Sequence, residues 1–136
     1  MLEMKETALI CRQASPKSLI LVDELGRATS NEDGASLAWA VSEFLLAKKC
    51  LTFFVTHYPQ LCKLSDVYRN VQNHHLDACI SPEGGEEGNI RYSHKVVAGP
   101  CRMNKNFGVE MAVSCGWPTD VINKVKFEVS WTPLQI

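Results

Sequence analysis

Two adjacent carboxylates follow directly on an apolar run near the start of the chain. Leu19 to Val22 are four consecutive large aliphatic residues, and Asp23 and Glu24 come immediately after them. Adjacent carboxylates repel each other and resist burial, so the pair indicates a nearby cation or a catalytic role. A solvated surface turn is the alternative interpretation of the same residues.

A second polar pair, Thr56 and His57, ends the next apolar run. Ligands of open parallel sheets bind beyond the carboxyl ends of the strands, and neighbouring strands lie about 4.8 Å apart, so both pairs could reach one phosphate and its Mg²⁺. Asp23 fits a ligand of Mg²⁺, and Glu24 could then orient and deprotonate an attacking water. With His57 donating to a terminal phosphate, this chemistry is phosphoryl transfer.

The elements that must position these groups alternate between helix and strand. The expected elements of the first half are residues 2–13, 18–24, 31–49 and 50–58, in the order helix, strand, helix, strand. Ser30 and Asp33 have the spacing of a capping box at the start of the second helix. Residues 18–57 therefore predict a strand–helix–strand unit of a parallel sheet, and the continuous aliphatic run predicts a strand covered on both faces.

The second half predicts a hairpin and two helices. The expected strands are residues 70–80 and 90–97 around the Gly-rich turn 81–89, and the expected helices are residues 106–115 and 119–128. The predicted fold class is α/β, mainly a parallel sheet flanked by helices, with a C-terminal hairpin and helices.

Composition limits the class of partner. The chain has 136 residues, 46% of them hydrophobic, which suits one globular domain. A formal net charge of −1 gives no overall basic face, so direct DNA contact by this segment is not indicated. No apolar stretch approaches the ~20 residues that span a bilayer, and no signal peptide follows Met1, so we expect an intracellular chain with no membrane partner.

A long segment of the chain resembles a known family. "SLILVDELGRATSNEDGASLAWAVSEFLL", residues 18–46, followed by "FFVTH", residues 53–57, is similar to the C-terminal ATPase domain of MutS-family DNA mismatch-recognition proteins. That domain has an ABC-type fold of the P-loop NTPase class. The resemblance covers about residues 1–125 and includes "LEMKETALI" at the start and "NFGVEMAVSCGWPTDVI" farther on.

The resemblance implies roles for the residues singled out above. Asp23 and Glu24 match the family's Walker B pair, with Asp23 on Mg²⁺ and Glu24 as general base, and His57 matches the His switch that senses the γ-phosphate of ATP. Residues 26–34 match the D-loop, which implies contact with a second MutS-type subunit through Gly26, Arg27, Ala28, Thr29 and Ser30. Ala28 replaces a glycine that is usual in this loop.

The match also has gaps. No Gly-Lys-Ser/Thr phosphate loop is present, and Gly84-Gly85 lies in an acidic stretch. The chain begins just after the position of the family's signature serine. Residues 126–136 diverge from the helical dimerisation element of the family and are interpreted as a divergent tail. We therefore expect half of a composite ATP site and no measurable ATPase from this chain alone, because each missing charge-assisted contact is worth roughly 1.5–3 kcal/mol.

The implied function is that of a part of an ATP-dependent DNA-binding protein of mismatch repair or meiotic recombination. The resemblance implies a nuclear protein of the eukaryotic type that binds mispaired or branched double-stranded DNA as a dimer, through domains upstream of this chain. One alternative is a non-catalytic interaction module that pairs with another MutS-type subunit. Another is an ABC-type chromosome-maintenance ATPase, but the sequence lacks heptads and its downstream similarity is to MutS proteins.

Overall fold

The computed structural model describes residues 2–81, 89–101 and 107–131 of the chain. The chain divides into two compact units, Met1–Val71 and Gln72–Ile136, and each is described by itself. Both units together give the α/β class that the sequence predicts. None of the described helices is long and apolar enough to cross a membrane.

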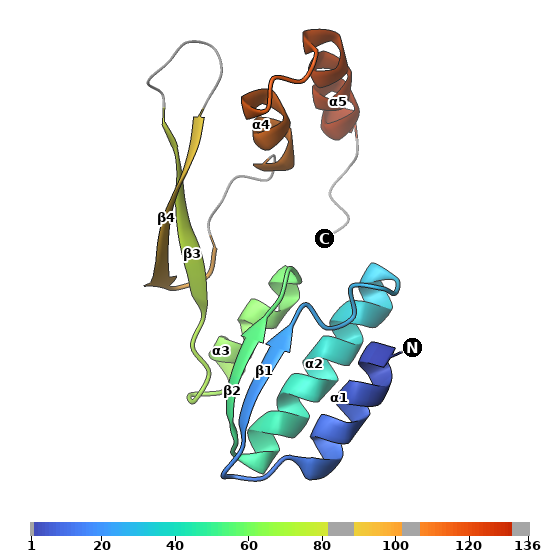
Figure 1. Ribbon diagram of the computed structural model, residues 1–136, viewed down its shortest axis with the longest axis vertical. Helices are drawn as coiled ribbons and strands as arrows, with labels where there is room; N and C mark the ends of the chain where they lie inside the picture. Colours follow the sequence, from blue (N-terminus) through green and yellow to red (C-terminus); the bar gives the residue numbers. More distant parts are fainter. Residues whose placement is uncertain (1, 82–88, 102–106, 132–136) are drawn as a thin grey trace. The chain divides into compact units, whose positions relative to one another are not determined.

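The first unit contains the predicted strand–helix–strand arrangement (Figure 1). Its elements are α1 (Leu2–Gln13), β1 (Leu19–Asp23), α2 (Asn31–Lys48), β2 (Leu51–Val55), the 3-10 helix η1 (Pro59–Lys63) and α3 (Leu64–Val67). Strands β1 and β2 are parallel, and their register places Asp23 beside Val55. The two strands therefore end at the same edge of the sheet.

Local sequence explains both ends of α2. Ser30 is the N-cap, and its hydroxyl accepts a hydrogen bond from the Asp33 amide at 3.2 Å, which confirms the predicted capping interaction. At the other end, Lys49 takes a left-handed conformation, with φ of 58°, and its amide donates to the Leu46 carbonyl. These caps fix the helix between the two strands of the crossover.

The core of the first unit lies between α2 and the segment after β2. Its buried cluster comprises Ala38, Tyr58, Leu61 and Leu64. Phe54 of β2 packs against this cluster, so the sheet is joined to α2, η1 and α3 through one of its faces.

The prediction that the strand of residues 19–22 is covered on both faces is wrong for this unit. Ile20 is 6% exposed, whereas Leu21 is 70% exposed. The exposed side chains share the other face of the two strands: Leu19, Leu21, Leu51, Phe53 and Val55. The reason is that α1 and α2 accompany only two strands here, and within residues 2–71 no element covers the second face.

The second unit contains an antiparallel hairpin and a helix pair. Its elements are β3 (His74–Ser81), β4 (Asn89–Ala98), α4 (Phe107–Ser114) and α5 (Thr119–Trp131). The hairpin and both helices confirm the prediction, although α5 continues past the expected end at residue 128. Residues 82–88 of the predicted turn and residues 132–136 of the predicted tail lie outside the described residues.

Candidate functional site

The two predicted acids stand where β1 ends. Asp23 is the last residue of the strand, and the Glu24 amide donates to the Val55 carbonyl of β2 at 2.9 Å, which continues the parallel pairing by one bond. Glu24 has φ of 49°, a left-handed conformation that is uncommon for a residue with a side chain. The chain therefore turns sharply at Glu24, and such strain is often found at functional sites.

A cleft of about 500 Å³ lies at this end of the sheet. Its lining residues are Glu3, Asp23, Glu24, Arg27 and Ala28. Three carboxylates and one guanidinium give the cleft an excess of negative charge, which favours a cation. Mg²⁺ needs only one or two protein carboxylates when waters and phosphate oxygens complete its coordination, so Asp23 fits this ion.

Glu24 forms an ion pair with Arg27. The Arg27 Nη1 donates to the Glu24 Oε2 at 2.9 Å, and the two side chains are 77% and 36% exposed. An exposed pair of this kind contributes about 0–1 kcal/mol. The guanidinium can therefore leave the carboxylate at small cost when a ligand approaches the cleft.

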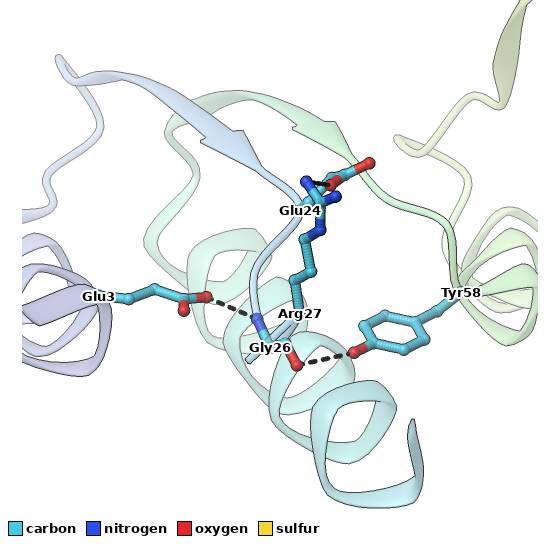
Figure 2. Close-up of polar contacts among 5 residues, drawn as sticks. All are labelled: Glu3, Glu24, Gly26, Arg27 and Tyr58. Carbon is cyan, nitrogen blue, oxygen red and sulfur yellow. Dashed lines mark hydrogen bonds and ion pairs between the residues drawn. The ribbon is translucent and has the colours of Figure 1, made fainter. Parts of the chain in front are cut away.

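The loop between β1 and α2 is held at the peptide groups of Gly26 (Figure 2). The Gly26 amide donates to Oε1 of Glu3, on α1, at 2.7 Å. The Gly26 carbonyl accepts from the Tyr58 hydroxyl at 2.9 Å and from the Thr29 amide at 3.2 Å. Two side chains from distant parts of the chain thus form hydrogen bonds with one residue of the loop.

Gly26 and Gly34 make this close packing possible. Gly26 has φ of 89°, and a Cβ built on it would lie 2.7 Å from the Gly34 Cα. A Cβ on Gly34 would collide with the Tyr58 hydroxyl and lie 2.7 Å from the Gly26 carbonyl oxygen. Both positions therefore require glycine for steric reasons.

His57 lies at the same edge of the sheet but is not among the residues that line the cleft. It is exposed, two residues beyond the end of β2, and its ring centroid is 4.1 Å from that of Tyr58. The Tyr58 amide donates to the Thr56 hydroxyl at 3.0 Å, which tightens the turn that carries the imidazole. Asp23 and Glu24 thus both line the cleft, whereas His57 follows the end of the neighbouring strand and lies outside the lining.

The residues expected at a subunit interface divide into two groups. Four of them are exposed, namely Arg27, Ala28, Thr29 and Ser30. Gly26 is buried and holds the conformation of the loop within the chain. Only the exposed four offer side chains to a second protein.

Sequence reasoning did not identify Glu3 and Tyr58 as residues of this site. In the sequence, Glu3 falls in the expected helix of residues 2–13, and Tyr58 is the last residue of the expected strand of residues 50–58. The spacing of these residues gives no sign that both reach Gly26. Among the described residues, no group of three or more His, Cys, Asp or Glu side chains could hold a metal ion by itself.

These features define the class of the protein. A parallel strand–helix–strand unit with acids at the strand end, followed by a tight Gly-containing loop, is part of the ABC-type ATPase fold of the P-loop NTPase class. The family model described as MutS domain V matches residues 1–130. The chain belongs to the MutS domain V family.

Bacterial proteins named DNA mismatch repair protein MutS are similar to nearly the whole chain. Identity is 41% over 125 residues with the protein of Fervidobacterium nodosum, 42% over 127 residues with that of Prochlorococcus marinus strain AS9601, and 40% over 124 residues with that of Thermotoga maritima. The matches cover 91–93% of this chain but only 13–15% of each relative. The chain thus spans about one seventh of the length of these relatives.

Proposed function

We propose that this chain supplies the Walker B half of a MutS-type ATP site, in a protein that uses ATP while acting on mispaired DNA. The observation that carries the proposal is the placement of Asp23 and Glu24 together at the carboxyl end of a parallel strand, on an open acidic cleft. Membership of the MutS domain V family supports ATP and Mg²⁺ as the ligands of that cleft.

Each acid has a distinct part in this proposal. Asp23 is exposed at the cleft and would hold Mg²⁺, which supplies charge neutralisation of the phosphates when bound. Glu24 would orient the attacking water and accept its proton once Arg27 releases the carboxylate. His57, on the neighbouring strand end, would donate a hydrogen bond to the terminal phosphate.

The partners follow from the same family. We propose that the exposed loop residues Arg27, Ala28, Thr29 and Ser30 contact a second MutS-type subunit. Double-stranded DNA, mispaired or branched, would be bound by other domains of the protein. The relatives reported above are named for mismatch repair, which favours that process over meiotic recombination. We also propose that the protein is nuclear and is a MutS homologue of the eukaryotic type.

A chimeric protein provides the test, because it supplies the phosphate loop that this sequence lacks. The chain would replace the matching 125-residue segment of the Fervidobacterium nodosum protein. We expect the chimeric protein to hydrolyse ATP in a Mg²⁺-dependent manner. Asp23→Asn should raise the Mg²⁺ concentration for half-maximal hydrolysis by about tenfold, since one of few carboxylate ligands is lost.

Asp66→Asn is the matched control, since Asp66 is an exposed carboxylate of α3 and lies outside the cleft. It should leave the Mg²⁺ requirement unchanged. A folded chimeric protein that binds ATP without hydrolysing it would instead favour a non-catalytic interaction module. An equal effect of both substitutions would remove Asp23 from the metal site.

A further inference from the structure

We infer that Glu3 and Tyr58 are positioning residues that fix the loop of the ATP site through hydrogen bonds to the amide and the carbonyl of Gly26. We call these three residues the Gly26 clamp. The inference rests on the proposed function, because the loop matters for catalysis only if Glu24 acts on bound ATP. Neither Glu3 nor Tyr58 needs to touch the nucleotide for this role.

The clamp joins three separate segments of the first unit. Glu3 comes from the first turn of α1, Gly26 from the loop after β1, and Tyr58 from the turn after β2 (Figure 2). Its two side-chain bonds measure 2.7 Å to the Gly26 amide and 2.9 Å to the Gly26 carbonyl. The amide bond is charge-assisted, and such bonds are shorter and stronger than neutral ones.

The Tyr58 side chain of the clamp is buried, and its hydroxyl is sterically confined. Tyr58 is 4% exposed, and its hydroxyl fits only because Gly34 has no side chain there. A buried hydroxyl without a partner is costly, so the Gly26 carbonyl fixes the position of the ring as much as the ring fixes the loop. Packing thus holds the Tyr58 ring against α2, and a hydrogen bond connects its hydroxyl to the loop.

Gly26 lies next to the residues whose positions matter for catalysis. Glu24 precedes it by two residues, and Arg27, the ion-pair partner of Glu24, follows it directly. Because Glu24 already has a strained backbone conformation, a loop released at Gly26 is free to relax and move that carboxylate. Small displacements of a general base lower the rate of proton transfer strongly.

On the other side of the clamp, Tyr58 directly follows His57, and the two rings are in contact. The clamp therefore ties the strand end that carries His57 to the loop that carries Glu24.

Hydrogen exchange of the full 136-residue chain tests whether the clamp exists in solution. The Gly26 amide should be protected, and Glu3→Ala should lower its protection by at least about tenfold, since its acceptor is removed. Glu3→Gln should restore most of the protection, because the amide side chain keeps an acceptor oxygen. Glu6→Ala, at an exposed position of the same helix, is the matched control. The Gly34 amide, bonded to the Ser30 carbonyl at 2.8 Å, should stay protected in every variant and reports that α2 remains folded.

Kinetics of the chimeric protein test the positioning role. Glu3→Ala and Tyr58→Phe should each lower kcat for ATP by about tenfold or more, with KM changed by less than about twofold, because Glu24 is displaced while the phosphate loop still binds the nucleotide. Glu3→Gln should recover most of kcat. Tyr92→Phe, which removes a hydroxyl in β4, should change neither parameter.

Four results would overturn the inference, and they separate it from the proposed function. A Gly26 amide that exchanges freely in the unaltered chain, or protection insensitive to Glu3→Ala, would show that the clamp does not form. Lost protection with unchanged kcat, while Glu24→Gln abolishes turnover, would leave the ATPase proposal standing and remove the clamp from catalysis. Unchanged turnover after Glu24→Gln would overturn the proposed function and the positioning role with it.

Discussion

The two faces of the β1–β2 sheet differ in what covers them, although the same two strands form both. On one face, Ile20 is buried and Phe54 packs against the cluster formed by α2, η1 and α3. On the other, five apolar side chains of the two strands are 57–70% exposed. Parallel strands of this composition are normally covered on both sides. The comparison shows that residues 2–71 form the acidic end of the sheet while covering only one of its two faces.

Substitutions on the covered side of the sheet should lower the unfolding free energy more than substitutions on the exposed face. Among them, Gly34→Ala should have the largest effect. The added methyl group meets the Tyr58 hydroxyl and the Gly26 carbonyl, so α2 and the loop cannot both keep their positions. We expect a loss of more than about 3 kcal/mol in unfolding free energy, measured by urea denaturation, because overpacking and a broken buried hydrogen bond coincide.

Gly108→Ala is the matched control, since nothing lies within 4 Å of a Cβ at this position of α4. It should be neutral or stabilising by up to about 1 kcal/mol, as alanine favours helix. Similar effects of the two substitutions would show that the loop and α2 are not tightly packed at Gly34.

A matched pair in β1 tests the two faces directly. Ile20→Ala should cost about 2–3 kcal/mol, because a buried side chain is removed from the covered face. Leu21→Ser should change unfolding free energy by less than about 0.5 kcal/mol, because Leu21 is 70% exposed. The same serine should reduce concentration-dependent association, measured by analytical ultracentrifugation, since exposed apolar patches promote it. A large loss of stability from Leu21→Ser would mean that the second face is covered in solution.

The smallest expected effect concerns Tyr68, at the border of the covered side. The hydrogen bond of its hydroxyl to Glu43, 2.7 Å long, raises the pKa of Tyr68 above 10.0, with burial and the Glu43 charge acting in the same direction. The folded state therefore holds this proton more tightly than the unfolded state, so the contribution to stability is complete below pH 10 and is lost as the pH rises through the higher folded value.

The ultraviolet absorbance change on ionisation of the phenol follows its titration, and the difference between the unaltered chain and Tyr68→Phe isolates this tyrosine. Glu43→Gln should shift the titration back toward lower pH, because it removes the negative charge. An unshifted titration would show that the Tyr68–Glu43 hydrogen bond does not persist in solution.

Much of this architecture could be predicted from the sequence, because short-range chemistry determines it. The aliphatic run before Asp23 and the cap at Ser30 gave correct positions for β1 and the start of α2. The acids were correctly expected at the strand end for the same reason. What could not be predicted depends on contacts between distant residues. Glu3 and Tyr58 are separated from Gly26 by 23 and 32 positions, and no periodicity relates them. The aliphatic run by itself predicted cover on both faces, because such a run reports what a strand can bury and not whether a second layer is present.

The most direct test of the ATP-site account is the turnover of the chimeric protein carrying Glu24→Gln, compared with Glu6→Gln at an exposed position of α1. Glutamine cannot accept the proton of the attacking water, so ATP should remain bound while hydrolysis falls by about 100-fold or more. Glu6→Gln should keep turnover within about twofold of the unaltered protein, as expected for an exposed side chain outside the cleft. Hydrolysis at the unaltered rate with Gln at position 24 would contradict the assignment of Glu24 as the general base.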